Sequence, residues 1–255
     1  MTLVRKFFKT FVWPVYDFLC RQFFRPSVRY SGYFSAFRDI VELSAREEMI
    51  KRAMAFIYFN NRLPGDYLEF GVWKGGTFTS AFYFAKRYPL PDMRFYAFDS
   101  FEGLPEITGV DAEGFKHFEQ GQFTCSEKQF RENIIKNGVD IKRVDTVPGW
   151  FDTVLNAETK KRLPIERAAV VWIDCDIYES TVPVLEFITS YLQDGTIIIF
   201  DDWFCYKGNP HRGEQRAFRE WLERHPTIHA SEFYKFGWGG NSFIIHTSAT
   251  GVEMR

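Results

Sequence analysis

Hydrophobic residues fall into two kinds of pattern along this chain. Short and nearly continuous apolar runs predict strands buried on both faces, at residues 67–70, 93–98, 144–147, 168–173 and 196–200. Segments with apolar residues three to four positions apart predict helices, at residues 43–60, 79–88, 127–137, 181–192 and 214–225, with a further helix beginning within 153–161. This alternation predicts an α/β fold with a mostly parallel sheet and helices on both of its faces.

Three details complete the predicted fold. Pro183 is expected in the first turn of the 181–192 helix, where proline is tolerated. Two late apolar segments, 229–236 and 242–247, are expected to form an antiparallel edge of the sheet. Residues 101–122 contain Gly, Pro and Glu and are expected to form a loop, of which residues 106–122 would close over a bound ligand.

The composition bounds the class of protein. The chain has 255 residues, of which 45% are hydrophobic, and this is enough for one sizeable core. Its formal net charge is -1, which provides no global attraction to nucleic acid or to an anionic membrane. It has four cysteines without a C-x-x-C pair and no apolar run long enough to span a bilayer. We therefore expect a soluble, cytoplasmic protein without a zinc knuckle or a disulfide framework.

Residues 1–42 differ in kind from the rest of the chain. Basic residues are interleaved with aromatic ones through residue 30, which predicts an N-terminal helical segment followed by one domain over residues 43–255. The segment either contacts a membrane surface, a partner or a second subunit through residues 1–30, or packs its aromatic side chains on its own domain. Pro14 disfavours one continuous helix. We expect a homo-oligomer and no nucleic-acid partner.

Acidic residues stand at the ends of four predicted strands: Glu69, Asp99, Asp174, and the pair Asp201 and Asp202. A single acidic residue in such a place usually caps a helix. In an open parallel sheet, however, the carboxyl ends of the strands line one ligand crevice. Four such positions in succession therefore predict carboxylates that converge in space although they lie far apart in the sequence.

The turn after the first strand, together with Asp99, predicts a nucleoside site. Residues 71–76 lack the G-x-G-x-x-G spacing of dinucleotide enzymes, but their glycines let a ligand approach the backbone at a helix N-terminus. Asp99, at the end of the second strand, can accept hydrogen bonds from both hydroxyls of a ribose. The hydroxyl of Ser100 can contact the edge of the ligand or cap the following turn, and both roles stay open.

Asp174, Asp201 and Asp202 predict a metal site. Their carboxylates offer hard oxygen ligands that suit Mg²⁺ or another divalent cation. Without a cation, like charges in one crevice would raise each other's pKa values. Asp176 completes a D-x-D pair with Asp174 but is placed second, because strand alternation or the following turn can direct its side chain elsewhere.

At these residues the chain resembles the macrocin O-methyltransferase family, the sugar O-methyltransferases of macrolide and aminocoumarin antibiotic pathways. The resemblance covers residues 60–205 and lies in GDYLEFGVWKGGTF, FDSFEGLP, PGWFDTVL, WIDCDIYESTVPVL and IIIFDDW, with a weaker match in RGEQRAF. It implies a Rossmann-like class I methyltransferase fold, S-adenosylmethionine as the cofactor, and a Mg²⁺ ion that chelates two adjacent hydroxyls of a sugar.

Carried over to the matching positions, the resemblance assigns the cofactor to Glu69, Gly71, Asp99 and Ser100, and we add Gly75, Thr77 and Trp150, which lie in the same motifs, as further cofactor candidates. It assigns the metal to Asp174, Asp201 and Asp202. The chain departs from the family at Cys175, where glycine is common, and at Trp203, where a tyrosine is frequent. We expect Trp203 and the aromatic N-terminal segment to shape the acceptor pocket.

The implied reaction is an in-line displacement of a methyl group from a sulfonium by a hydroxyl of a sugar or glycoside that bears vicinal hydroxyls, with a catechol-like diol as the second acceptor class. Asp174 is the expected base and doubles as a metal ligand, and His117 in the expected lid is the second candidate. Two alternatives stay open: a metal-dependent nucleotide-sugar glycosyltransferase, and a non-catalytic nucleoside-binding module in which the aspartates cap helices.

Overall fold

The structure is a computed structural model that describes residues 43–112 and 118–247. The predicted N-terminal segment, residues 1–42, lies outside the described residues, and so does His117. The described residues from Ser44 onward belong to one compact unit. None of the helices in this part of the chain is long and apolar enough to cross a bilayer.

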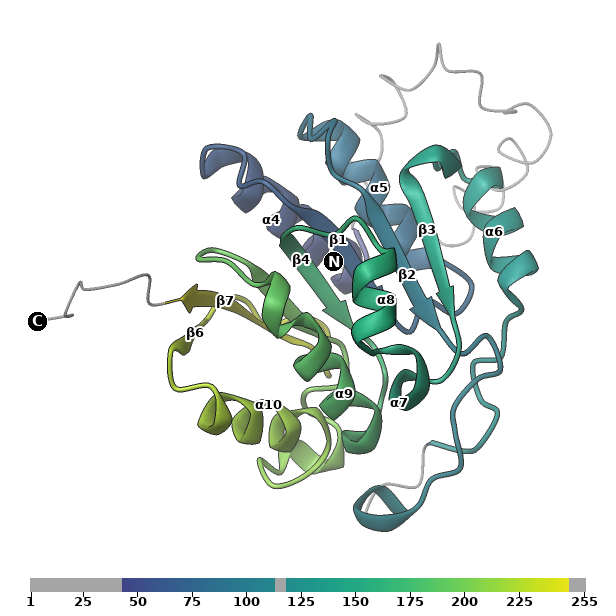
Figure 1. Cartoon of the computed structure of the whole chain (residues 1–255), viewed down its shortest axis with the longest axis vertical. Coiled ribbons are helices and arrows are strands. Elements are labelled where there is room, and N and C mark those ends of the chain that lie inside the picture. The colour runs from purple at the N-terminus through teal and green to yellow at the C-terminus, as the bar shows by residue number, and fades with distance from the viewer. Residues whose placement is uncertain (1–42, 113–117, 248–255) are drawn as a thin grey trace, which may run out of the picture. The chain divides into compact units, whose positions relative to one another are not determined.

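The unit is built on one sheet of seven strands, in the order β3-β2-β1-β4-β5-β7-β6 (Figure 1). The strands are β1 (Asp66–Phe70), β2 (Phe95–Asp99), β3 (Val144–Pro148), β4 (Ala168–Ile173), β5 (Ile197–Phe200), β6 (Ile228–Glu232) and β7 (Asn241–Thr247). Strands β1 to β5 are parallel, whereas β7 runs antiparallel to both β5 and β6. The predicted mostly parallel sheet with an antiparallel edge is confirmed.

Helices cover both faces of the sheet because the strands between them are apolar on both sides. One set consists of α4 (Ala45–Phe59), α5 (Gly76–Arg87) and α6 (Glu127–Lys136). The other set consists of α7 (Phe151–Val154), α8 (Ala157–Arg162), α9 (Tyr178–Ile188) and α10 (Gly213–Arg224). Short 3-10 helices lie at Gly109–Ala112, Ile141–Arg143, Thr189–Tyr191 and Tyr206–Gly208.

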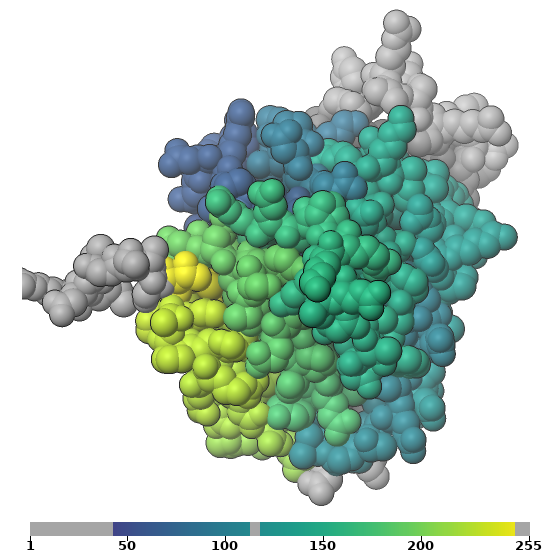
Figure 2. Space-filling view, in the orientation of Figure 1, coloured from purple at the N-terminus to yellow at the C-terminus, as the bar shows by residue number. Residues whose placement is uncertain are grey.

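Alternation along β1 divides the aromatic core between the two faces. The ring of Tyr67 lies 6.0 Å from that of Phe78 in α5, whereas the ring of Phe70 lies 6.4 Å from that of Phe187 in α9. Every residue of β4 is buried, as a central strand covered on both faces requires. Figure 2 shows the outer surface of α8, α9 and α10, which belong to the second set of helices.

A capping box fixes the start of α4. The hydroxyl of Ser44 accepts a hydrogen bond from the Glu47 N–H at 3.2 Å, and the Glu47 carboxylate accepts one from the Ser44 N–H at 3.0 Å. This reciprocal pair satisfies two backbone donors that a helix N-terminus leaves free. It also holds Arg46, in the first turn, beside the carboxyl ends of the strands.

Helix α9 begins at Tyr178 rather than at residue 181, so the expectation that Pro183 lies in its first turn is wrong. Pro183 instead lies inside the helix, where it cannot donate to the Glu179 carbonyl. The earlier start has a physical cause. The carboxylate of Asp111, from the loop after β2, accepts hydrogen bonds from the N–H groups of Tyr178 and Glu179, both at 3.0 Å.

The helix predicted to begin within 153–161 is divided into α7 and α8. Asn156 separates them because its side-chain oxygen accepts hydrogen bonds from the N–H groups of Glu158 at 2.9 Å and Thr159 at 3.0 Å. Asparagine competes well for this capping role. The division leaves α7 as a single turn directly after Trp150, at the carboxyl end of β3.

The loop after β2 is tied down at its base. The Leu104 N–H donates to the Gln122 carbonyl at 2.9 Å, and the Gly121 N–H donates to the Leu104 carbonyl at 2.9 Å. Buried Asp111 joins the described part of the loop to α9. Residues 106–122 would therefore have to close over a ligand while these hydrogen bonds hold the base of the loop. Their closure stays a prediction.

Candidate functional site

Two adjoining cavities lie at the carboxyl ends of β1, β2, β4 and β5. The first, of about 290 Å³, is lined by Asp99, Trp150, Asp176 and Asp202 among others. The second, of about 320 Å³, lies on the side of α4 and is lined by Glu69 and Thr77 among others. Four residues line both cavities: Arg46, Gly71, Trp73 and Asp174. The structure thus brings four of the predicted carboxylates, Glu69, Asp99, Asp174 and Asp202, to one rim of the sheet.

Gly71 joins the glycine turn to the end of β4. Its φ of +85° is in the left-handed region, and a Cβ atom there would lie 1.8 Å from the Asp174 carbonyl oxygen. The Asp174 N–H donates to the Phe70 carbonyl at 2.8 Å. No side chain larger than hydrogen fits at position 71, so the turn can pass directly against Asp174.

Asp99 holds the glycine turn with its carboxylate. Its Oδ2 accepts hydrogen bonds from the N–H groups of Val72 at 2.7 Å and Trp73 at 3.1 Å, and its Oδ1 accepts one from Phe101 at 2.7 Å. Burial raises the pKa of Asp99, although these hydrogen bonds oppose the rise. A carboxylate has about four lone-pair sites. Asp99 therefore keeps room for one further donor, and its predicted contact with two ribose hydroxyls stays a prediction.

Two more of the predicted cofactor residues line the first cavity. The hydroxyl of Ser100 donates to the Gly103 carbonyl at 2.9 Å and accepts from the Glu102 N–H at 3.1 Å. It therefore caps the following turn, which was one of its two expected roles. Trp150 lies at the N-cap of α7 and lines the first cavity.

The remaining predicted cofactor residues divide between the second cavity and the core. Glu69 is buried, and its Oε2 accepts a hydrogen bond from the Tyr67 hydroxyl at 2.5 Å. Burial raises the pKa of Glu69 well above its usual range. Thr77 lies beside it in the first turn of α5. Gly75 lines neither cavity; a Cβ atom there would meet the Ile134 side chain at 2.6 Å, so this glycine lets α6 pack closely.

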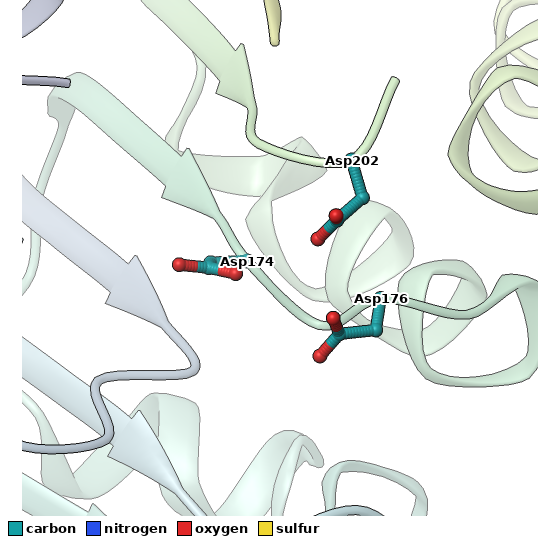
Figure 3. Close-up of side chains that lie close together, drawn as sticks. All are labelled: Asp174, Asp176 and Asp202. Carbon is teal, nitrogen blue, oxygen red and sulfur yellow. The ribbon is translucent and has the colours of Figure 1, made fainter. Parts of the chain in front are cut away.

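Asp174, Asp176 and Asp202 form a group of three carboxylates beside the first cavity. One oxygen from each lies within 4.8 Å of the others, and Figure 3 shows Asp176 and Asp202 turned toward the same space beside Asp174. Asp176 reaches this place because its φ is 66°, a left-handed conformation that Asp tolerates better than most residues. The residue placed second by sequence is thus a member of the group.

The electrostatics of this group favour a bound cation. Burial, followed by the charge of Asp201, raises the pKa of Asp202 to about 6. Burial and the neighbouring carboxylates raise the pKa values of Asp174 and Asp176 well above their usual range. The Oδ2 atom of Asp202 is buried and has no hydrogen-bond partner among the described residues. Hard oxygen donors, mutual repulsion and an unpartnered oxygen together fit a divalent cation.

Asp201, the third predicted metal ligand, faces a different partner. Its Oδ1 accepts a hydrogen bond from the Arg46 Nε at 2.7 Å, and its Oδ2 accepts one from the Arg46 Nη2. Such a two-pronged pair fixes both side chains. The structure therefore groups Asp176, rather than Asp201, with Asp174 and Asp202. The sequence contained no signal for Arg46, which lies 155 positions from Asp201.

The two departures from the family motifs both lie in the core. Cys175 is buried and its Sγ lies 3.6 Å from the Thr181 Oγ1, although the residue also borders the first cavity between the flanking aspartates. The ring of Trp203 lies 4.7 Å from that of Phe243 and 5.0 Å from that of Phe200. The expectation that Trp203 shapes the acceptor pocket is wrong, because it packs on the core and lines neither cavity.

Of the two candidate bases, Asp174 belongs to the described residues. Asp174 lines both cavities, at the junction between the glycine turn and the carboxylate group. His117 and the N-terminal part of the expected acceptor pocket lie outside the described residues.

Comparison with known proteins gives a family and several relatives. A family model described as macrocin-O-methyltransferase (TylF) matches residues 43–225. A tetracenomycin rhamnosyl 4'-O-methyltransferase of Streptomyces olivaceus is 35% identical over 146 residues, which are 55% of this chain and 54% of that protein. Mycinamicin III 3''-O-methyltransferase of Micromonospora griseorubida is 33% identical over 169 residues, 64% of this chain and 62% of that protein. The chain thus spans between half and two thirds of the length of these relatives.

The fold of this chain resembles those of solved O-methyltransferases. The O-methyltransferase NovP has a TM-score of 0.66 at 24% identity, with 78% of this chain and 79% of that chain covered. The calicheamicin methyltransferase CalS11 has a TM-score of 0.63 at 24% identity, with 78% of this chain and 77% of that chain covered. The predicted Rossmann-like class I methyltransferase fold is confirmed by this likeness and by the strand order.

Proposed function

Since this chain belongs to the macrocin O-methyltransferase family, we propose that it transfers a methyl group from S-adenosylmethionine to a hydroxyl of a sugar or glycoside, assisted by a divalent cation. One observation carries the proposal. A glycine turn held by Asp99 and a group of three carboxylates line the same cavity, so a nucleoside cofactor and a cation would lie side by side.

The acceptor class follows from the names of the relatives. One is named for a rhamnosyl-bearing tetracenomycin, and the other for mycinamicin III. Both are O-methyltransferases of natural products. A sugar hydroxyl of a glycoside is therefore the acceptor that we propose, with vicinal hydroxyls because two adjacent oxygens can share one cation.

The chain's own residues provide a site for the cofactor. Gly71 allows the backbone to approach a ligand closely, and the free lone pair of Asp99 is available to a ribose hydroxyl. The indole of Trp150 offers a flat apolar surface for the base. S-adenosylmethionine would supply the methyl group on a positively charged sulfonium. Glu69 and Thr77, in the second cavity, complete the cofactor set that we propose.

Asp174, Asp176 and Asp202 would hold the cation, with Mg²⁺ favoured by their hard oxygen donors. A bound divalent cation would lower the pKa of the acceptor hydroxyl and fix its orientation. The positive charge of Arg46 offsets the negative charge of Asp201 at the edge of this group. We retain Asp174 as the proton acceptor because it is the one carboxylate of the three that lines both cavities.

Two other functions are distinguishable by binding. A nucleotide-sugar glycosyltransferase would bind UDP or GDP through its metal, and a non-catalytic nucleoside-binding module would need no cation. We expect calorimetry to detect S-adenosylhomocysteine binding and no binding of UDP or GDP, and family membership favours this outcome. Tight binding of a nucleoside diphosphate would support the glycosyltransferase.

The direct test is methyl transfer to simple glycosides. The full chain is incubated with labelled S-adenosylmethionine, MgCl₂ and a panel of methyl glycosides that includes methyl α-L-rhamnopyranoside, with EDTA in matched samples. We expect label on at least one glycoside, and its loss in EDTA that added Mg²⁺ restores. Absence of transfer to every glycoside would refute sugar O-methylation, and transfer that is insensitive to EDTA would refute the metal.

Stability as a function of pH gives an independent prediction for the cation. The raised pKa values, about 6 for Asp202 and well above the usual range for Asp174 and Asp176, mean that these carboxyls take up protons on folding. The metal-free protein should therefore lose stability as pH rises from about 4 through about 6. A cation competes with those protons, so saturating Mg²⁺ should raise Tm by about 5–10 °C near pH 8 and by much less near pH 5.

Thermal unfolding in EDTA and in MgCl₂ at both pH values measures this difference. An equal shift at the two pH values, or none near pH 8, would mean that these carboxyls do not hold the cation.

A further inference from the structure

Exposed aromatic side chains gather at the mouth of the first cavity. Among the described residues, the large apolar side chains that are exposed are Phe59, Trp73, Phe123, Ile135 and Trp238. Three of these five, Trp73, Phe123 and Trp238, line the first cavity. Exposed apolar surface that is concentrated at a polar cavity indicates a binding surface.

The three aromatic side chains belong to different halves of the cavity. Trp73 and Phe123 contact each other edge to face, with ring centroids 5.7 Å apart. The N–H of Trp73 donates to Asp99, so this pair stands on the side that we assign to the cofactor. Trp238 comes from the connection between β6 and β7, where the neighbouring Gly239 packs against the Asp201 carbonyl.

The backbone around Trp238 is held firmly although its side chain is exposed. Phe236 and Gly240 pair through two backbone hydrogen bonds of 3.1 Å and 3.0 Å. A Cβ atom on Gly240 would lie 2.2 Å from the Phe236 ring, so this ring packs directly on the Gly240 backbone. The Gly239 carbonyl accepts a hydrogen bond from the Phe204 N–H at 2.8 Å. The tip is therefore anchored, while the Trp238 side chain is 74% exposed.

The anchored tip lies against the segment that carries the carboxylates. A Cβ atom on Gly239 would lie 3.0 Å from the Asp201 carbonyl oxygen, which directly precedes Asp202. Trp238 and Asp202 also line the same cavity. One bound molecule could therefore contact both the exposed indole of Trp238 and the carboxylate group.

We propose that Trp238 binds the sugar ring of the acceptor, with its indole against the apolar C–H face of a pyranose and the ring hydroxyls directed toward Asp174, Asp176 and Asp202. The inference rests on the proposed sugar O-methylation. A pyranose combines a face of C–H groups with a rim of hydroxyls, and this matches an aromatic plane next to carboxylates. Trp238 takes the role that the sequence suggested for Trp203.

The test compares Trp238→Ala with Trp238→Phe, using Phe59→Ala as the matched control because Phe59 is 73% exposed and lines neither cavity. Steady-state methyl transfer to methyl α-L-rhamnopyranoside gives KM and kcat. Saturation-transfer NMR with S-adenosylhomocysteine and Mg²⁺ reports which ring protons touch the protein. Calorimetry gives the Kd of S-adenosylhomocysteine, and light scattering gives the mass of the assembly.

We expect Trp238→Ala to raise KM at least about tenfold and to weaken saturation transfer to the ring C–H protons. The Kd of S-adenosylhomocysteine should stay the same, and Trp238→Phe should recover most of the loss. Phe59→Ala should behave like the wild type. A folded Trp238→Ala variant with an unchanged KM overturns the inference, and a changed mass at unchanged KM would assign Trp238 to a contact between copies. If the wild type methylates no glycoside of the panel, the proposed function fails and the inference fails with it.

Discussion

Asp202→Asn is expected to reduce methyl transfer by about 10²–10³-fold at saturating Mg²⁺, since a cation contributes several kcal/mol and each 1.36 kcal/mol is about tenfold in rate. The substitution keeps the shape of the side chain and an oxygen that can accept from the Cys205 thiol, which lies 3.2 Å from Oδ1. It removes one of the three charged ligands that we propose. The loss should appear in kcat/KM, together with weaker binding of Mn²⁺ as a Mg²⁺ substitute.

The same substitution should stabilise the protein in EDTA. Burial and the charge of Asp201 raise the pKa of Asp202 to about 6, so its ionised form is disfavoured in the folded state. Removing that charge should increase the free energy of unfolding near pH 8 by about 1–2 kcal/mol. Urea unfolding measures the change. Activity and stability should therefore move in opposite directions, which simple damage to the fold would not produce.

Asp194→Asn is the matched control for Asp202→Asn. Asp194 is exposed and lies before β5, away from both cavities, so it should change neither activity nor stability measurably. Full activity of Asp202→Asn, with Mn²⁺ affinity equal to that of the control, would remove Asp202 from the metal site.

Gly71→Ala is expected to lower the free energy of unfolding by about 3 kcal/mol or more and to abolish binding of S-adenosylhomocysteine. Alanine at a φ of +85° is strained, and its Cβ atom would lie 1.8 Å from the Asp174 carbonyl oxygen. The obstacle is backbone, so no side-chain rotation relieves it. Relief requires β1 and β4 to separate at the place where we propose that the cofactor and the carboxylates meet.

Gly76→Ala provides the comparison from the same turn. Gly76 begins α5, and a Cβ atom there meets no heavy atom within 4 Å. Alanine should leave stability unchanged or raise it by up to about 1 kcal/mol. Urea unfolding of both variants measures the contrast. A Gly71→Ala variant within about 1 kcal/mol of the wild type would show that the contact with Asp174 is not rigid.

The fold was largely predictable because its signals are local. The apolar run 168–173 coincides with β4, and the other predicted strands agree with the structure to within two residues, except that the segment predicted over 229–236 ends four residues earlier, at Glu232 of β6. Those boundaries also place Glu69, Asp99, Asp174 and Asp202 near strand ends, where the topology of a parallel sheet brings them together. Family membership followed from the same motifs and is confirmed.

What the sequence did not predict depends on contacts between distant segments. The pairing of Asp201 with Arg46 joins β5 to the first turn of α4, and no periodic pattern records it. Asp176 joins the carboxylate group through a left-handed φ, which the spacing of a D-x-D pair does not reveal. Asp111 caps α9 from a loop and moves its start ahead of Pro183. Trp238 stands at the cavity because a glycine tip is fixed against Asp201.

Anomalous diffraction at the manganese edge, from crystals of the full chain grown with Mn²⁺ and S-adenosylhomocysteine, tests the central claim most directly. We predict one strong peak bounded by the carboxylates of Asp174, Asp176 and Asp202, with the nucleoside of S-adenosylhomocysteine beside Asp99 in the same cavity. Bound S-adenosylhomocysteine with no manganese peak between these carboxylates would contradict the account.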